Sequence, residues 1–253
     1  KSPRIRGSSE SMGAQWKHSG RLQNSSKRSA LIGKLVKEII VAAKMGDPSP
    51  DNNARLRAGV EAAKKQSVPR DTIERAIKKA SGADQENYEE ARYEGMGPGN
   101  VSLIIEALTN NRNRTASELR IAFDKHGGNL GEEGAVSWMF KTKGIITLPK
   151  SAIGEDALFE LVTENGADDF DASGDDYEIR VAPDHFHSLV DVLQKKGLQP
   201  ASADLAKVAD MPIKVTGENA SKAIELLEML DDHDDVQGVH TNAEFDQQEL
   251  DAL

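Results

Sequence analysis

The spacing of apolar residues changes near Gly82, and this change divides the chain into two parts of different structural class. Before Gly82, apolar residues recur every three or four positions, which is the period of an amphipathic helix. After it, short runs of strand-forming residues alternate with helical stretches. The sequence therefore predicts a helical N-terminal region followed by mixed helix and sheet.

The N-terminal region is expected to form three short amphipathic helices. The first begins at Lys27 and ends at Gly46-Asp47-Pro48, because glycine and proline terminate helices. The second starts after Asp51 or Asn52, and the third begins near Pro69, which suits a first helical turn. The residues expected to face inward are Leu31, Ile32, Leu35, Val36, Ile39, Ile40, Ala43, Leu56, Val60, Ala63, Ile73, Ala76, Ile77 and Ala80.

The rest of the chain is expected to form two sets of elements, each in the ferredoxin-like order β-α-β-β-α-β. The outer set comprises a strand at 101–108, the helix after it, strands at 135–143 and 210–215, a helix over 219–231 and a strand at 235–241. The inner set comprises a strand at 144–149, a helix over 155–165, a hairpin through Asp171–Asp176, a helix over 184–196 and the segment LQPASADL. The predicted fold class is α+β, with a three-helix bundle followed by two ferredoxin-like α/β domains, one inserted in the other.

Four segments follow from these predictions. Residues 1–11, KSPRIRGSSES, are interpreted as an expression-tag remnant, with Met12 as the natural start. Residues 12–82 form the basic helical domain, and 83–143 plus 207–246 form the outer α/β domain. Residues 144–206 form an inserted acidic α/β domain.

Charge is sorted along the chain. Residues 13–82 contain 15 Lys and Arg against 6 Asp and Glu, a net of +9, whereas 151–253 contain 6 against 25, a net of −19. Such asymmetry indicates contact with nucleic acid or a membrane surface. The apolar stripes lack Trp and Phe and are matched across three helices, which favours nucleic acid over a membrane. The predicted nucleic-acid-binding residues are Lys17, Arg21, Lys27, Arg28, Lys34, Lys37, Arg55, Arg57, Lys64, Lys65, Arg70, Arg75, Lys78, Lys79, Arg112 and Arg114.

The last two of these residues belong to the motif NNRNRT at 110–115, where a strand passes into a helix. Free backbone N–H groups at a helix start, together with arginine side chains, can bind phosphate. In the alternative interpretation, Asn113 or Thr115 caps the helix and both arginines pair with acids of the body. The sequence leaves these two interpretations open.

The other motifs favour structural roles. GMGPGN precedes a strand, the reverse of a nucleotide-binding loop, so a turn with a positive φ at a glycine is expected. His185 and His187 are expected in the first turn of a helix rather than at a metal. The acid-rich DDHDD at 231–235 is expected to be a solvated run at a helix end rather than a Mg²⁺ site. We therefore expect no enzyme activity, no cofactor and no metal.

Composition limits the cellular context. There is no cysteine, which excludes disulfides and cysteine-based zinc sites and suits a reducing, cytoplasmic compartment. No apolar stretch approaches the roughly 18 residues that span a bilayer, so we expect no membrane partner. We also expect a monomer.

Several stretches resemble the YebC family, which includes bacterial proteins labelled probable transcriptional regulators and mitochondrial translational activators. The similar text is KLVKEIIVAAKMG, NARLRAGVEAAKK, RDTIERAIKKASG, YEGMGPGN, LTNNRNRTASELRIAFDKHGGNLGEEGAVSWMF and MLDDHDDVQGVHTN. The resemblance implies three domains and no known enzyme activity. Two functions stay open: a DNA-binding transcriptional regulator, or a translation factor that binds ribosomal or messenger RNA. The net charge of −19 at the acidic end would suit a basic protein surface such as the ribosome offers.

Overall fold

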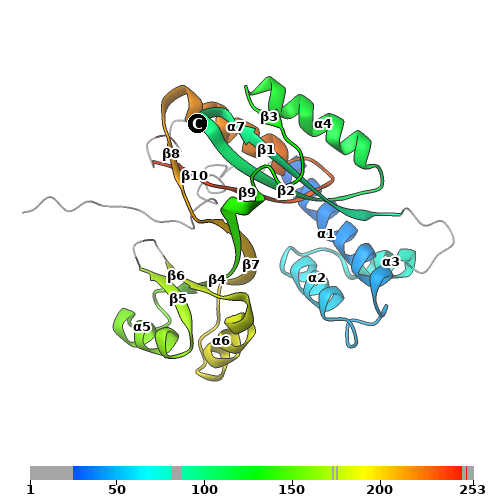
Figure 1. Ribbon diagram of the computed structural model, residues 1–253. Helices are drawn as coiled ribbons and strands as arrows, with labels where there is room; N and C mark the ends of the chain where they lie inside the picture. The colour runs from blue at the N-terminus through cyan, green and yellow to red at the C-terminus, as the bar shows by residue number, and fades with distance from the viewer. Residues whose placement is uncertain (1–24, 81–86, 173, 175, 247–248, 250–253) are drawn as a thin grey trace, which may run out of the picture. The chain divides into compact units, whose positions relative to one another are not determined.

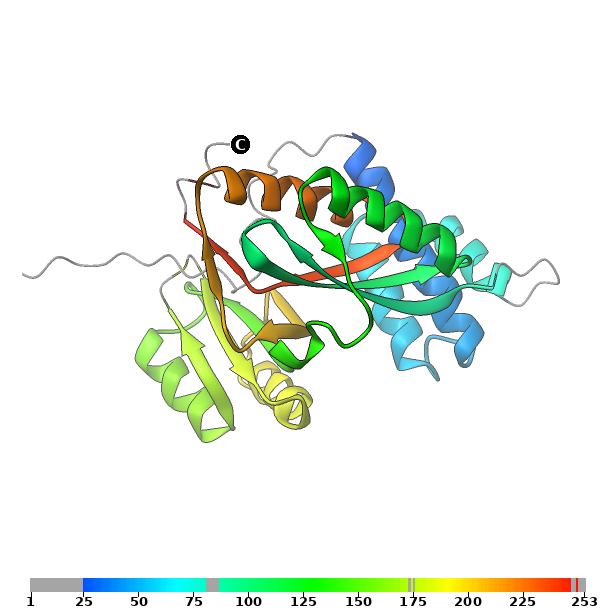
Figure 2. The ribbon, with the colours of Figure 1, turned by 45° about the horizontal axis from the view of Figure 1, so that its top comes forward.

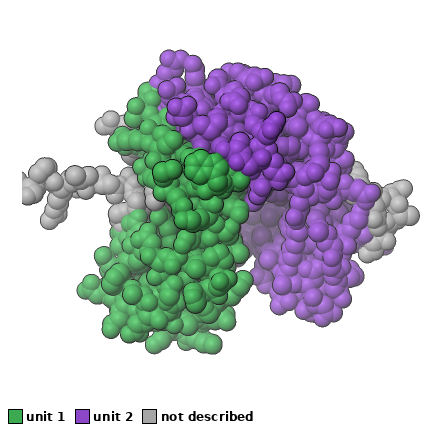
Figure 3. Space-filling view, viewed as in Figure 1, with its two compact units in different colours: residues 1–19, 137–217, 240–253 green, residues 20–136, 218–239 purple. Residues whose placement is uncertain are grey.

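The computed structural model describes residues 25–80, 87–172, 174, 176–246 and 249, with the side chains of 25–27 left out. The described residues form two compact units, which Figure 3 colours separately. One unit contains residues 137–217 and the described part of 240–253. The other contains the helical region, the stretch to Val136 and residues 218–239.

The predicted three-helix bundle forms from α1 (Ser25–Met45), α2 (Ala54–Lys65) and α3 (Arg70–Ala80) (Figure 1). Its apolar core contains most of the predicted residues and is centred on Ile39, Leu56 and Ala63, which are completely buried. Leu31, which was expected to face inward, is instead 40% exposed. Asn53 caps α2, because its Oδ1 accepts a hydrogen bond from the backbone N of Leu56 at 3.0 Å. The Nδ2 of Asn53 also donates to the carbonyl oxygens of Ala42 and Asp47, at 2.8 and 2.9 Å, which fixes the loop after α1.

In the same unit, an outer sheet has the strand order β3-β1-β2-β9, and two helices cover one of its faces (Figure 2). Its elements are β1 (Glu89–Gly97), β2 (Val101–Thr109), α4 (Arg112–Lys125), β3 (Asn129–Leu130), α7 (Gly217–Asp231) and β9 (Val236–Thr241). Two glycines of β1 allow the helices to approach closely. A Cβ at Gly95 would lie 2.7 Å from the Phe123 ring of α4, and one at Gly97 would lie 3.3 Å from Leu226 of α7. The turn between β1 and β2 has the expected positive φ, at Gly99 (72°).

Three strand predictions for the outer sheet differ from the structure. The strand predicted at 210–215 forms only over Ile213–Val215, and it pairs with Ala243–Phe245 instead of joining the outer sheet. Strand β1 was not predicted, and the expected strand at 135–143 does not form as one element. Ser137–Met139 is instead a short 3₁₀ helix, and a strand begins only at Phe140. The reason lies in Glu94, a buried acid of β1. Its Oε2 accepts a hydrogen bond from the backbone N of Val136 at 2.9 Å, which ties this segment to β1 as a loop.

The other unit contains an inner sheet of order β5-β6-β4-β7, in which every neighbouring pair is antiparallel. Its elements are β4 (Phe140–Pro149), α5 (Glu155–Glu164), β5 (Ala167–Asp171), β6 (Asp176–Val181), α6 (Pro183–Lys195) and β7 (Ser202–Ala209). This is the ferredoxin-like order predicted for the inserted domain. His185 and His187 lie at the start of α6, as expected. The predicted boundaries at 143/144 and 206/207 fall inside β4 and β7.

A short parallel pair, β8 (Ile213–Val215) and β10 (Ala243–Phe245), belongs to the same unit as the inner sheet. Apart from this pair, the strand pairings established for the two larger sheets are antiparallel. The α+β class, with an N-terminal helical bundle followed by antiparallel sheets, is confirmed. Among the helices described, none has the length and apolar character needed to cross a bilayer.

Candidate nucleic-acid interface

The exposed cations of the bundle lie mainly on α2 and α3. On α3, the buried residues Ile73, Ala76 and Ala80 occupy one side of the helix, so the charged residues are left on the solvent side. Lys64 and Lys65 are exposed in the last turn of α2. The predicted binding residues that are exposed in the bundle are Arg28, Arg57, Lys64, Lys65, Arg70, Arg75, Lys78 and Lys79.

Several arginines of this surface have partners close in sequence. The Nε of Arg70 lies 2.7 Å from Glu74 Oε1, one turn along α3, and the Nε of Arg75 donates to the carbonyl oxygen of Asp71 at 3.1 Å. Exposed contacts of this kind contribute little to stability, because water competes with each partner. A phosphate can therefore replace such a partner at little cost.

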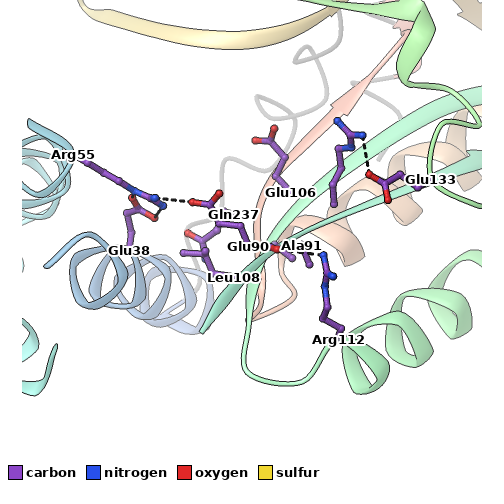
Figure 4. A pocket seen from close by; sticks show the side chains of 11 residues that line it. Glu38, Arg55, Glu90, Ala91, Glu106, Leu108, Arg112, Glu133 and Gln237 are labelled. Carbon is purple, nitrogen blue, oxygen red and sulfur yellow. Dashed lines mark hydrogen bonds and ion pairs between the residues drawn. The ribbon is translucent and has the colours of Figure 1, made fainter. Parts of the chain in front are cut away.

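Arg55 is engaged differently, because it joins the bundle to the outer sheet (Figure 4). Its Nε lies 2.6 Å from Glu38 Oε1 on α1, and its Nη1 lies 2.6 Å from Glu90 Oε1 on β1. The hydrogen bond to Glu38 is the largest cause that raises the pKa of Arg55 above its already high value. Arg55 therefore holds elements together, and its geometry does not favour the phosphate contact expected for it.

Arg55 also lines a cavity of about 510 Å³ beside β1 and β2 (Figure 4). Arg92 and Glu133 lie on the same wall, with Arg92 Nη2 3.3 Å from Glu133 Oε1. Arg112 reaches it from α4, where its Nε lies 3.9 Å from Glu89 Oε2. Because four carboxylates and three guanidinium groups line this cavity, its charge does not favour an anion.

Lys34 and Lys37, on α1, face residues 231–235 of the same unit. The Nζ of Lys37 lies 2.8 Å from Asp235 Oδ1 and donates to the carbonyl oxygen of Asp234 at 3.0 Å. Its Nζ also lies 5.1 Å from the centre of the Tyr88 ring. The Nζ of Lys34 donates to the carbonyl oxygen of Asp231. In this structure both lysines are therefore used in contacts within the protein.

Asp235 is the centre of this network and is buried. Its Oδ2 accepts hydrogen bonds from Arg114 Nη2 and Thr115 Oγ1, both at 2.7 Å, while its Oδ1 faces Lys37. Burial by itself would raise the pKa of Asp235, but the hydrogen bonds from Lys37, Thr115 and Arg114 together lower it well below its usual range. Asp235 is therefore an ionised carboxylate with three donors.

In the motif NNRNRT, the two arginines pair with acids of the body, which was the alternative to phosphate binding. Arg114 pairs with buried Asp235, and Arg112 lies near Glu89, so both face acids of the body. The helix cap is Asn111, whose Oδ1 accepts a hydrogen bond from the backbone N of Arg114 at 3.1 Å. The expectation of a cap at Asn113 or Thr115 is wrong, because the Thr115 hydroxyl is committed to Asp235.

The expectation for residues 231–235 is correct in part. Asp232 and Asp234 are exposed, but Asp235 is not solvated. Nothing in the local sequence reveals this burial, because its partners Arg114 and Lys37 lie 121 and 198 residues away. The sequence also gave no sign of the acids Glu38 and Glu90 as partners of Arg55.

One group of possible metal ligands lies beside Asp235. Ligand atoms of Glu118, His233 and Asp235 lie within 4.8 Å of one another. His233 Nδ1 accepts a hydrogen bond from the backbone N of Asp235 at 3.1 Å, which leaves the proton of the neutral ring on Nε2, next to Glu118. Since Lys37 and Arg114 already occupy the Asp235 carboxylate, the residues do not fit a cation.

Three of the predicted binding residues cannot be placed. Lys17 and Arg21 lie outside the described residues, and so does the side chain of Lys27.

Comparison with known proteins gives consistent matches along the chain. Residues 13–83 match the family described as TACO1/YebC protein N-terminal domain, and 88–243 match TACO1/YebC second and third domain. A probable transcriptional regulatory protein of Koribacter versatilis is 44% identical over 228 residues, covering 90% of this chain and 92% of that protein. One from Desulfatibacillum aliphaticivorans is 44% identical over 220 residues, with 87% and 89% covered.

A solved structure is also similar. The crystal structure of a conserved hypothetical protein from Aquifex aeolicus has a TM-score of 0.78 and 40% sequence identity. The match covers 88% of this chain and 93% of that one. The fold described above is therefore shared with an experimentally determined structure.

Proposed function

The chain belongs to the TACO1/YebC family, and on that premise we propose that it is a nucleic-acid-binding regulator of gene expression, specifically a DNA-binding transcriptional regulator. The observation that carries the proposal is the set of exposed cations on α2 and α3, in a bundle that buries most of its apolar residues in a core of its own. The names of the relatives from Koribacter and Desulfatibacillum support the regulatory role.

The chemistry of this surface suits the phosphate backbone rather than base edges. Lysine ammonium groups neutralise phosphates and release counterions, so they provide affinity that depends on salt and little on sequence. Lys64, Lys65, Lys78 and Lys79 are exposed near the C-terminal ends of α2 and α3. The proposal therefore assigns these lysines to phosphate contacts.

The test replaces one pair of adjacent lysines and compares it with a matched pair. Lys78→Ala with Lys79→Ala should weaken binding to duplex DNA of any sequence. It should also flatten the plot of log affinity against log salt by about two units, since each phosphate contact on duplex DNA contributes roughly −0.9. Fluorescence anisotropy over a series of salt concentrations measures both quantities.

The matched control is Lys195→Ala with Lys196→Ala, an exposed adjacent pair at the end of α6 in the other unit. This variant has the same change in net charge and should keep the affinity and the slope of the wild-type protein. Equal losses in the two variants would refute the assignment of phosphate contacts to α3, because the effect would then come from net charge alone.

A second candidate function, a translation factor that binds the ribosome, is favoured by the net charge of −19 over residues 151–253. Such a surface repels nucleic acid and suits basic proteins. The same two variants separate the candidates when ribosome co-sedimentation is measured beside DNA binding. If the α3 variant loses ribosome binding while the wild-type protein shows no affinity for duplex DNA, the translation role replaces the regulator role.

A further inference from the structure

We infer that residues 231–235, here called the acidic corner, inhibit nucleic-acid binding by holding α1 against the outer sheet, and that a nucleic acid must displace them to reach Lys34 and Lys37. The inference rests on the proposed function, since it concerns cations of the same bundle. It goes further in two ways. Two lysines of α1 become phosphate contacts that are blocked in the free protein, and a segment of the same chain controls access to them.

The acidic corner binds α1 with the groups that a nucleic acid would use. Asp235 presents an ionised carboxylate to Lys37, and the carbonyl oxygens of Asp231 and Asp234 accept from Lys34 and Lys37. Carboxylate and carbonyl oxygens replace phosphate oxygens as acceptors for the same ammonium groups. The side chain of Lys37 is only 13% exposed as a result.

The surroundings of Lys37 also repel a phosphate while the contact is closed. A cavity of about 620 Å³ lies beside the lysine, and its wall includes Glu118, Asp232 and Asp234. With Asp235, four carboxylates face two cations, Lys37 and Arg114. Because like charges at short range repel, a phosphate approaching through this cavity meets a net negative wall. Lys37 therefore becomes available only if α1 and the acidic corner separate.

The contact is of a kind that can open. Among the described residues, the apolar cluster of the bundle contains only residues of the bundle itself, from Ile32 to Ala80. Polar contacts join the bundle to the outer sheet and the residues next to it: those of Lys34 and Lys37, the pair of Arg55 with Glu90, and Lys44 with Asn87. Val41 of α1 is also buried, and it lies outside the apolar cluster of the bundle. Opening separates the buried pair of Lys37 and Asp235, but Asp235 keeps the hydrogen bonds from Arg114 and Thr115. A phosphate can then replace the carboxylate as the acceptor for Lys37.

The test compares two substitutions that make the same change in net charge. Asp235→Asn keeps the shape of the side chain and removes the charge that holds Lys37 and Arg114. Asp124→Asn, at an exposed position of α4, serves as the control. Binding to duplex DNA is measured over a range of salt concentrations, and melting temperatures establish that each variant is folded.

We expect Asp235→Asn to raise the affinity about tenfold, and to steepen the salt slope by up to about 1.8 units as Lys34 and Lys37 gain phosphates. Asp124→Asn should change the affinity by less than about twofold, as expected for one exposed charge at a distance. Equal affinities and slopes in the two variants overturn the inference, and so does weaker binding by Asp235→Asn.

A second measurement needs no nucleic acid. The chain contains no cysteine, so Glu61→Cys in α2 and Ile121→Cys in α4, both exposed, can carry a pair of spin labels. Pulsed electron paramagnetic resonance should give a broader distance distribution for labelled Asp235→Asn than for labelled Asp124→Asn. Identical distributions would overturn the inference, whether or not the wild-type protein binds DNA. A wild-type protein that binds no DNA would instead refute the proposed function.

The labelled wild-type protein provides the remaining test, which is independent of how well Asp235→Asn folds. At saturating duplex DNA, the distribution between α2 and α4 should shift or broaden relative to the free protein. A distribution unchanged by bound DNA would show that α1 stays closed during binding, and the acidic corner would then have no inhibitory role.

Discussion

The guanidinium group of Arg114 lies 2.7 Å from the carboxylate of Asp235, although 121 residues separate them in the chain. The pair connects the first turn of α4 to the segment that enters β9. Arg114 is partly exposed, whereas the Asp235 side chain is only 5% exposed. The exposed partner therefore satisfies a buried charge, which makes Arg114 more important for stability than its position on the surface indicates.

Arg114→Ala should consequently destabilise the protein, and Arg112→Ala should not. Loss of Arg114 leaves the buried Asp235 carboxylate short of one donor, which costs about 1–3 kcal/mol. Arg112 lies 3.9 Å from Glu89, and both of these side chains are more than half exposed, so its loss should cost less than about 0.5 kcal/mol. Urea unfolding followed by circular dichroism measures both values. Equal stabilities of the two variants would contradict the role of the Asp235 network.

A second prediction concerns Gly144, in the middle of β4. A Cβ at this position would lie 2.8 Å from Val181 and would overlap the ring of Phe186, both of which belong to the core of the inner sheet. Gly144→Ala should therefore lower the stability of this unit by about 1–3 kcal/mol or more, as overpacking does. Gly154→Ala is the control, because no atom of the described residues lies within 4 Å of its Cβ and φ is −68°. Gly154 is the N-cap of α5, so this variant should lose only the smaller N-cap preference, about 0.5–1 kcal/mol. Thermal unfolding should separate the two variants clearly, and similar melting temperatures would be inconsistent with the packing described.

Glu178 provides a prediction on pH. Burial is the largest cause that raises the pKa of Glu178, and the opposing effect of Arg180, 2.8 Å away, does not compensate it. The folded state therefore binds the proton more tightly than the unfolded state, whose pKa is about 4.3. The stability that this group contributes is present below about pH 4 and is lost as pH rises through the folded value.

Glu178→Gln removes this titration, so its stability relative to the wild-type protein should increase as the pH rises from about 4 to 7. Unfolding in urea at several pH values measures the difference. Glu160→Gln, an exposed position on α5, is the matched substitution and should show a much smaller change with pH. If the stability of Glu178→Gln relative to the wild-type protein stayed constant or fell as the pH rose, burial would not raise the pKa of Glu178 as described.

The cap of α2 gives a fourth prediction. Asn53→Ala loses the cap bond to Leu56 and both Nδ2 bonds that fix the preceding loop, so it should cost about 1–2 kcal/mol. Asn52 is exposed, and its side-chain Nδ2 makes a weak contact of 3.4 Å with Asp47 Oδ2. Asn52→Ala should therefore change little in the same chemical denaturation experiment. A cost of the same size at Asn52 would argue against the specific role of the cap.

The parts of the fold that the sequence predicted are those with a strong local pattern. The helices α1 to α3 have apolar residues at helical spacing and end at glycine or proline, so their existence and inward faces could be predicted. Strand β1 was missed because Gly95 and Gly97 replace the β-branched residues that mark a strand. These glycines are needed where helices α4 and α7 pack, a tertiary demand with no local signal.

The candidate site was predictable only as a distribution of charge. The excess of Lys and Arg in residues 13–82 indicated the bundle, and the exposed positions on α3 agree with the helical period. Whether a particular cation is exposed or paired depended on residues far away in sequence. Lys37 and Arg114 are paired because the fold brings Asp235 next to them, whereas Lys78 is exposed.

Strands β4 and β7 are hydrogen-bonded neighbours, and the pairing extends to Phe140 and Ala209 at the ends of the inserted segment. Just beyond them, the backbone N of Asp210 donates to the carbonyl oxygen of Met139 at 2.9 Å. The two ends of the segment from Phe140 to Ala209 therefore lie side by side. Without this segment, a short hairpin turn would be enough to connect Met139 to Asp210. A segment whose two ends meet in this way can change in length during evolution without moving the chain on either side of it. A laboratory deletion that joins the two strand ends through a two-residue turn would exploit the same geometry.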